Sequence, residues 1–152
     1  MLLQELLQSY RESGKAILAA NFYNFETLSG ILQAAKQKQA PVILQLSESS
    51  IQYLGVKTAA GMARNLLEQT NVTGWLHLDH GHSPDIIHAC LDAGFDSVMI
   101  DASEKPYAEN VRLTADIVQL AAAYKANVEA ELGYIAKLGQ AQATGQFTQP
   151  EE

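Results

Sequence analysis

The stretch Leu76-His77-Leu78-Asp79-His80-Gly81-His82 decides how the rest of the chain is interpreted. A strand-like apolar run ends here in a dense cluster of ionisable groups. Ser83 can cap a helix that starts at once, with Pro84 at its first position. Asp79 and His80 would therefore sit where a buried strand meets solvent, which is where α/β folds place their chemistry.

Composition limits the classes of protein to consider. With 152 residues and 47% hydrophobic content, the chain can form one domain with a substantial core. Its net charge of -7 argues against nucleic acid or an anionic membrane as a partner. No apolar run approaches the roughly 20 residues of a membrane span, and the acidic, amphipathic start is not that of a signal peptide. A single cysteine, Cys90, excludes an internal disulfide and predicts a cytoplasmic setting.

Apolar runs alternate with helical patterns along the chain. Strands are predicted at residues 16–20, 41–46, 74–78, 96–100 and 127–131. Helices are predicted at residues 2–10, 24–37, 58–68, 84–93 and 107–124. This alternation predicts a parallel sheet covered by helices. The spacing, about 25–30 residues for each strand and helix, fits either an open doubly wound sheet or part of an eight-unit barrel.

The same pattern carries more local expectations. The first strand is expected to be buried, and the serines that follow the second strand are expected to form a turn. One stripe of the long helix is expected to face the core, namely Val111, Ala115, Val118 and Ala122. Residues 1–138 would form the folded domain, and residues 139–152, which are polar and rich in Gly, Gln and Thr, a loop or disordered tail.

Polar side chains recur at every predicted strand end. They are Asn21, Gln45, Ser47, Asp79, His80, Asp101, Glu129 and Glu131. The carboxyl ends of parallel strands lie on one face, so these groups are expected to gather in one bowl. A single polar strand end is ordinary, because Asn, Ser and Asp favour turns and caps. The whole series, with two glutamates inside a strand, predicts a functional site.

The histidines differ in what their positions indicate. Alternation along a strand sends Asp79 and His80 to opposite sides, so both can act only if the strand is already opening into its loop. His77 lies inside the strand and is expected to be a packed or hydrogen-bonded core residue. His82 is expected in a loop near the next helix cap, and His88 on a helix surface.

A histidine among carboxylates at strand ends suits a divalent metal of the zinc type. Such a metal polarises a carbonyl oxygen while a nearby carboxylic acid moves a proton. Two interpretations remain open from the residues alone. One is lyase or isomerase chemistry through an enediolate, and the other is a binuclear metal hydrolase that uses the spacing of His80 and His82.

Three segments resemble the class II, metal-dependent ketose-bisphosphate aldolases, which act on fructose or tagatose bisphosphate. They are Leu78 to Gly81, Ser97 to Asp101 and Val128 to Gly133, and the first two strand ends also fit. The resemblance covers about residues 1–135 in order. It implies a (β/α)8 barrel of the TIM type, of which this chain would hold the first half: about five strands, four barrel helices and a leading helix.

The resemblance also implies roles for individual residues. Asp79 matches the acid that exchanges a proton with the C4 hydroxyl, and His80 matches the first catalytic zinc ligand. The carboxylates of an alternative position of the zinc, or of another divalent metal, match Asp101 and Glu131. Contacts to the phosphorylated ketose would come from Asn21, Gln45 and Ser47. The implied reaction is reversible cleavage of a ketose 1,6-bisphosphate into glycerone phosphate and glyceraldehyde 3-phosphate, with zinc stabilising the enediolate.

Two departures from the family pattern matter. The loop after Gly133 usually carries an acid that takes a proton from glycerone phosphate, but no acid occurs here between Glu131 and Glu151. Either a different base acts, or the chain is not a standard aldolase. In addition, a (β/α)8 barrel needs about 250 residues. The family's other two zinc histidines and its glycine-rich phosphate loop are therefore expected beyond residue 152.

A half barrel has consequences of its own. It exposes two unpaired parallel edges and an apolar inner face, so we expect it to associate, for example as a homo-oligomer. We also expect little aldolase activity from 152 residues alone, because one histidine and carboxylates make a poor zinc site. The alternative to an aldolase is a non-catalytic half barrel that pairs with itself or with a complementary half.

Overall fold

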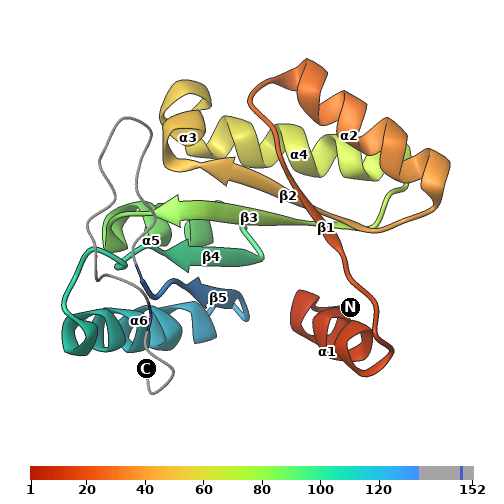
Figure 1. Ribbon diagram of the computed structural model, residues 1–152. Coiled ribbons are helices and arrows are strands. Elements are labelled where there is room, and N and C mark those ends of the chain that lie inside the picture. The colour runs from red at the N-terminus through yellow and green to blue at the C-terminus, as the bar shows by residue number, and fades with distance from the viewer. Residues whose placement is uncertain (134–147, 149–152) are drawn as a thin grey trace.

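The computed structural model describes residues 1–133 and 148, and it contains one parallel sheet with helices packed against it (Figure 1). The strands are β1 (Leu18–Asn21), β2 (Val42–Ser47), β3 (Gly74–Gly81), β4 (Ser97–Ile100) and β5 (Asn127–Ala130). The helices are α1 (Leu3–Glu12), α2 (Phe25–Lys38), α3 (Glu48–Leu54), α4 (Val56–Thr70), α5 (Pro84–Asp92) and α6 (Tyr107–Ala122). The predicted tail, residues 139–152, lies outside the described residues apart from position 148.

The order of the strands identifies the architecture. Each strand pairs in parallel with the next strand in the chain, so the sheet order is β1-β2-β3-β4-β5. Crossovers between parallel strands are right-handed, so a sheet that never reverses its order keeps its connecting helices on one face. An open doubly wound sheet would reverse its order and carry helices on both faces. The structure therefore confirms the prediction of a (β/α) barrel type, with the first five strands present.

Alternation along the strands builds the core between sheet and helices. The side chains of β2, β3 and β4 that face the helices are Val42, Leu44, Leu46, Leu76, Leu78, Val98 and Ile100, all at most 2% exposed. They form one cluster with residues of the covering helices, including Leu28, Leu32, Ala59, Ala63, Ile87 and Ile117. The opposite face of each strand is left for the groups that point inward.

Helix α1 lies at the amino ends of the strands, apart from the other helices (Figure 1). Leu3 and Leu6 bury their side chains against Trp75, with Ile17 and Ile43 packed around them. Trp75 and Ile43 lie near the starts of β3 and β2, on the face of the sheet opposite the covering helices. Helix α1 therefore covers the amino-terminal end of the inner face and leaves the carboxyl ends of the strands open.

Two helix boundaries follow the sequence signals closely. The Ser83 side chain accepts a hydrogen bond from the backbone N–H of Ile86, and Pro84 opens α5, as predicted. Asn24 likewise caps α2 by accepting from the N–H of Thr27. These caps fix where the chain turns back from each strand end, so they also set the rim of the bowl.

The prediction of a serine-rich turn after β2 is wrong, because a helix begins there. Ser47 accepts a hydrogen bond from the N–H of Ser50 and so caps α3. The following helix, α4, begins directly after Gly55, earlier than predicted. Serine is a frequent cap residue as well as a turn residue, and this run of serines starts a helix.

The first strand is exposed, contrary to the prediction. Leu18 retains 68% of its side-chain surface in β1. Within the described part of the chain, β1 is an edge strand that pairs only with β2. An apolar strand at the edge of a partial sheet lacks the neighbours that would bury it.

The stripe predicted for the long helix is also wrong. Val111 and Val118 are about half exposed (48% and 50%), whereas Ile117 and Asn110 face the interior. The Asn110 amide donates hydrogen bonds to two backbone carbonyls, those of Ala102 (3.1 Å) and Glu131 (2.8 Å). A buried amide must be satisfied in this way, and α6 is rotated so that Asn110, Ile117 and Ala121 face the interior.

We expect the core between sheet and helices to dominate stability. Leu78→Ala should lower the free energy of unfolding by about 2–5 kcal/mol, because it leaves a cavity at a fully buried position. Leu18→Ala is the matched control, since this strand leucine is exposed and should change the free energy by under about 1 kcal/mol. Urea denaturation of both variants tests the prediction, and equal losses would contradict the assigned core.

Candidate metal centre at the strand ends

The end of β3 departs from regular strand geometry. The register between β3 and β4 shifts between Leu78 and Gly81, and His80 adopts a left-handed φ of 53°. Strict alternation is therefore broken where the sequence required it to be, and Asp79 and His80 both reach the bowl. Gly81 lets the backbone of β3 lie close to that of β4 at this point, because a Cβ at position 81 would be only 3.0 Å from the carbonyl oxygen of Met99.

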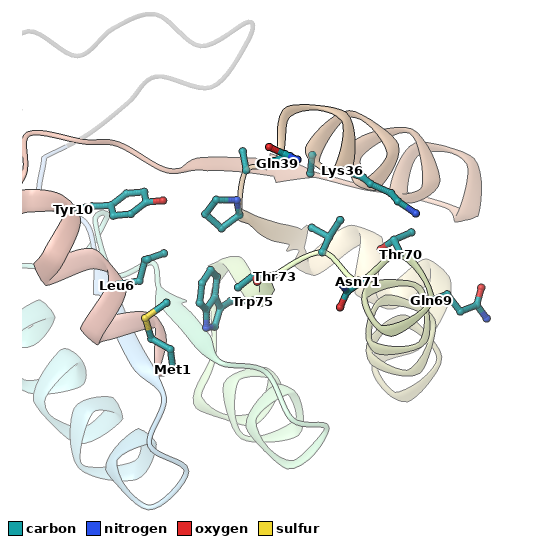
Figure 2. Close-up of a pocket in the computed structure, with 14 residues that line it drawn as sticks. Met1, Leu6, Tyr10, Lys36, Gln39, Gln69, Thr70, Asn71, Thr73 and Trp75 are labelled. Atoms are coloured by element: carbon teal, nitrogen blue, oxygen red, sulfur yellow. The ribbon is translucent and has the colours of Figure 1, made fainter.

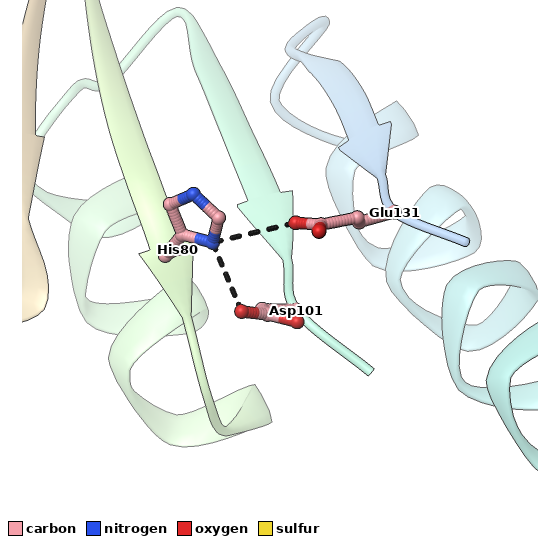
Figure 3. Close-up of side chains that lie close together, drawn as sticks. All are labelled: His80, Asp101 and Glu131. Carbon is pink, nitrogen blue, oxygen red and sulfur yellow. Dashed lines mark hydrogen bonds and ion pairs between the residues drawn. The ribbon is translucent and has the colours of Figure 1, made fainter. Parts of the chain in front are cut away.

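Three ligand-type side chains from neighbouring strands converge at this point (Figure 3). His80 lies in β3, and Asp101 and Glu131 directly follow β4 and β5. The Nδ1 atom of His80 lies 2.9 Å from Oδ2 of Asp101 and 3.6 Å from Oε2 of Glu131. One ligand atom from each residue lies within 4.8 Å of the other two. The predicted metal residues are thus brought together, and we call them the strand-end cluster.

The carboxylates determine the protonation of this cluster. The hydrogen bond to Asp101 raises the pKa of His80, with further help from the negative charges of Asp79, Asp101 and Glu131 against the cost of burial. Burial alone would raise the pKa of Asp101, but hydrogen bonds from Ser103 and His80 outweigh it and lower that pKa. The cluster therefore joins His80 to two carboxylates at a point that a cation could occupy.

Asp79 lies beside the cluster and is held from the first strand. The Asn21 amide donates a hydrogen bond of 2.7 Å to Oδ2 of Asp79, and Oδ1 lies 4.0 Å from Nε2 of His80. The side chain of Asp79 is 21% exposed. Asn21, predicted as a substrate contact, thus orients the carboxylate of Asp79 in this structure.

The other two predicted substrate residues lie on β2. Gln45 is half-buried and pairs in register with Asn21 on one side and His77 on the other. The hydroxyl of Ser47 lies 3.0 Å from the hydroxyls of both Ser49 and Ser50. By this register Gln45 and Ser47 face the same side of the sheet as His77 and Asp79.

His82 does not belong to the strand-end cluster. Its backbone N–H donates to Oε2 of Glu48 over 3.1 Å, and its Nδ1 lies 3.2 Å from the same oxygen. Glu48 begins α3, a helix that the sequence did not predict, so this contact could not be foreseen. The binuclear use of His80 and His82 would need both rings on one centre, but they contact different carboxylates.

A second row of polar groups lies one layer below the cluster. His77 is 3% exposed, as expected for a core histidine, and its Nδ1 lies 2.9 Å from the hydroxyl of Ser97. Burial lowers the pKa of His77 to about 4, so the ring is neutral near pH 7. Burial and then the charge of Asp79 raise the pKa of Glu129, which lies 3.5 Å from Nε2 of His77.

Ser97 was not singled out from the sequence, whereas Glu129 was predicted among the polar groups at the strand ends. Alternation from Glu131 would have placed Glu129 on the same inner face of β5. The register of the parallel strands then aligns Ser97 with His77. That register is a tertiary property, and the sequence alone does not supply it.

The strand-end cluster fits a divalent metal by its chemistry. Imidazole nitrogen and carboxylate oxygen are ligands for zinc and for other first-row divalent cations. The three side chains come from the ends of adjacent strands, and a cation could be held between His80 and the two carboxylates. His80, Asp101 and Glu131 are therefore the residues that would hold a metal.

A recess of about 760 Å³ lies at the other end of the sheet, between α1 and the turns before β2 and β3 (Figure 2). Trp75 and Leu6 form its apolar wall, and Lys36 and Gln39 lie on its rim. Barrel enzymes place their active sites at the carboxyl ends of the strands. We therefore assign the functional site to the strand-end cluster and not to this recess.

The fold and the strand-end cluster define a β/α-barrel protein with a site suited to a divalent cation. The chain belongs to the class II fructose-bisphosphate aldolase family, whose sequence profile, "Fructose-bisphosphate aldolase class-II", matches residues 1–152. This confirms the resemblance expected from the strand-end motifs. It also agrees with the geometry of the cluster, because aldolases of this class generally depend on a divalent metal.

Individual relatives agree with the family. The chain is 43% identical over 136 residues to the fructose-bisphosphate aldolase of Geobacillus stearothermophilus. The matched region covers 88% of this chain and 47% of the relative. The chain is also 44% identical over 134 residues to a probable fructose-bisphosphate aldolase of Bacillus subtilis (strain 168), covering 86% and 47%. The chain thus spans about half the length of these relatives.

Solved structures show the same fold. The YdjI aldolase from Escherichia coli K12 superposes with a TM-score of 0.81 at 31% identity, over 90% of this chain and 54% of that one. A putative fructose-1,6-biphosphate aldolase from Coccidioides immitis gives a TM-score of 0.77 at 38% identity, over 89% and 47%. Among the described residues, no helix is both long and apolar enough to cross a membrane.

Proposed function

We propose that the chain supplies the amino-terminal half of a class II aldolase barrel that reversibly cleaves fructose or tagatose 1,6-bisphosphate. The products are glycerone phosphate and glyceraldehyde 3-phosphate. The observation that carries the proposal is the strand-end cluster beside Asp79, in a chain of this family. Zinc is the metal that we propose, held by His80, Asp101 and Glu131.

The residues of the chain divide the chemistry between them. A bound metal would supply Lewis-acid polarisation of the ketose carbonyl. Asp79 would take the proton from the C4 hydroxyl as the C3–C4 bond breaks, and return it in the reverse direction. Asn21 orients Asp79 through the 2.7 Å hydrogen bond. Gln45 and the hydroxyl of Ser47 offer neutral hydrogen-bonding groups to the phosphorylated substrate on the same rim.

The edges of the sheet suggest how the site is completed. Among the described residues, β1 and β5 each pair with one neighbour only, and Leu18 and Ala130 are exposed. We propose that these edges associate with further barrel strands, and that copies of the protein form a homo-oligomer. A cytoplasmic setting is proposed from the single cysteine, Cys90, which is buried as a free thiol.

The test joins residues 1–133 of this chain to the carboxyl-terminal half of the Geobacillus stearothermophilus aldolase. The fusion should cleave fructose 1,6-bisphosphate in a zinc-dependent reaction, whereas the 152-residue chain alone should show little activity. Asp79→Ala should lower kcat by about 100- to 10,000-fold, the usual contribution of a general acid–base group. Triose phosphate release, coupled to NADH oxidation, measures the rate.

The matched control is Asp85→Asn in the same fusion. Asp85 is an exposed carboxylate at the start of α5, outside the cluster, and its change should leave kcat within about twofold. A fusion that folds and binds zinc but cleaves neither epimer would refute the proposed activity. Full activity in the Asp79→Ala variant would refute the role of Asp79.

A further inference from the structure

One buried polar atom remains unsatisfied in the described part of the chain, and it lies just below the strand-end cluster. Nε2 of His77 has no hydrogen-bond partner, although its ring is buried. The nearest charged group is Oε2 of Glu129, at 3.5 Å. A buried polar atom without a partner is costly, so its environment calls for an explanation.

The surroundings of His77 repeat the arrangement of the cluster above it. The cluster takes a histidine from β3 and acids that follow β4 and β5. The lower row takes His77 from β3, Ser97 from β4 and Glu129 from β5. Both rows therefore tie the same three strands together across the inner face of the sheet. Glu129 precedes the cluster residue Glu131 by two positions, on the same side of β5.

The chemistry of the lower row favours one tautomer of His77. A neutral imidazole carries one proton, and the carboxylate of Glu129 can only accept a hydrogen bond. The proton is therefore favoured on Nε2, facing Glu129. The hydroxyl of Ser97 then donates to Nδ1 over 2.9 Å, which fixes the ring. The side chain of Glu129 is 60% exposed and has the freedom to close the remaining gap.

We propose that His77 is a positioning residue: held by Ser97, it fixes the carboxylate of Glu129 and thereby sets where β5 presents Glu131 to His80. This inference rests on the proposed function, because it concerns the metal-binding geometry of the same site. The role differs from that of a ligand, since His77 and Glu129 lie outside the strand-end cluster. It differs from simple packing, since it depends on a proton at one ring nitrogen.

The first arm of the test needs neither metal nor activity. Two-dimensional 1H–15N NMR of the ring nitrogens of the 152-residue chain should show His77 in the neutral Nε2–H form near pH 7. Ser97→Ala should release the ring and mix the two tautomers, and Glu129→Gln should shift the Nε2 resonance. A ring in the Nδ1–H form would place the proton on the Ser97 side and overturn the proposal.

The second arm measures Co²⁺ affinity by isothermal titration, with the d–d absorption spectrum as a report of geometry. His77→Phe keeps an aromatic ring but removes both ring nitrogens. It should weaken Co²⁺ binding by about tenfold, as the loss of other groups that orient metal ligands does. His77→Gln retains an amide donor and should recover most of the affinity. His88→Phe is the matched control, because His88 is exposed on α5 and its ring contacts Asp92 and Tyr124 instead of the cluster.

The outcomes separate this inference from the proposed function. A wild-type chain that does not bind Co²⁺ would refute the metal site, and the positioning role with it. Equal Co²⁺ affinities in the wild-type chain and in His77→Phe would refute the positioning role alone. If His77→Phe loses its helical circular dichroism, Ser97→Ala is compared instead. Its expected effect is a weakening of several-fold, and unchanged affinity would overturn the proposal.

Discussion

His80→Ala is expected to weaken Zn²⁺ binding by more than about 100-fold, because it removes the only nitrogen ligand of the strand-end cluster. The carboxylates of Asp101 and Glu131 would then lie close together without a partner of opposite charge. Competition titration against a chromophoric chelator measures the change. Binding should also weaken as the pH falls, because the raised pKa of His80 makes protons stronger competitors of the metal.

His82→Ala is the informative comparison for this prediction. His82 is the adjacent histidine on the same segment, but its ring contacts Glu48. Its replacement should leave zinc affinity within about twofold. An equal loss in both variants would mean that the two histidines share a centre, and it would favour the metal hydrolase over the aldolase. Retained affinity in His80→Ala would place the metal elsewhere in the chain.

The second large effect is a loss of stability in mild acid. The pKa of His77 is about 4 in the folded chain because the ring is buried, against about 6.5 when the chain is unfolded. Between these values the unfolded chain binds more protons than the folded one, so stability falls as the pH falls. No stability is lost to this ring above about pH 6.5, and about 3 kcal/mol has been lost by the time the pH reaches 4.

The measurement compares urea denaturation of the wild type and His77→Gln from pH 7 to pH 4. The variant lacks the titrating ring, so its stability should fall less steeply over this interval. His88→Gln serves as the matched control, since it makes the same substitution at an exposed position on α5. Parallel slopes in wild type and His77→Gln would show that His77 is not protonated on unfolding in this range.

Much of the architecture could be predicted from local signals. The caps at Asn24 and Ser83 and the alternation of apolar strands with helices set the order of elements, which the structure reproduces. The errors arose where tertiary context decides burial. Leu18 has the pattern of a buried apolar strand but lies at a sheet edge. Helix α6 buries Ile117, Ala121 and the amide of Asn110, and its valines face outward.

The functional site shows the same division between what local sequence patterns predict and what tertiary context decides. The residue types and the rule that parallel strand ends share one face were enough to predict that Asp79, His80, Asp101 and Glu131 gather together. The bond between Asn21 and Asp79 and the row of His77, Ser97 and Glu129 depend on strand register and on the irregular end of β3. Register follows from the packing of whole strands, so no local pattern in the sequence could supply it.

The amide of Asn110 has a consequence for how such a protein can diverge. It holds the main-chain carbonyl of Glu131 from α6, a helix that precedes β5 in the chain. The anchor for this acid is therefore inherited with the upstream half of the unit and not with the segment that comes after Gly133. Because the donor and the acceptor of this bond both precede Gly133, a substitution after Gly133 leaves the support of position 131 in place.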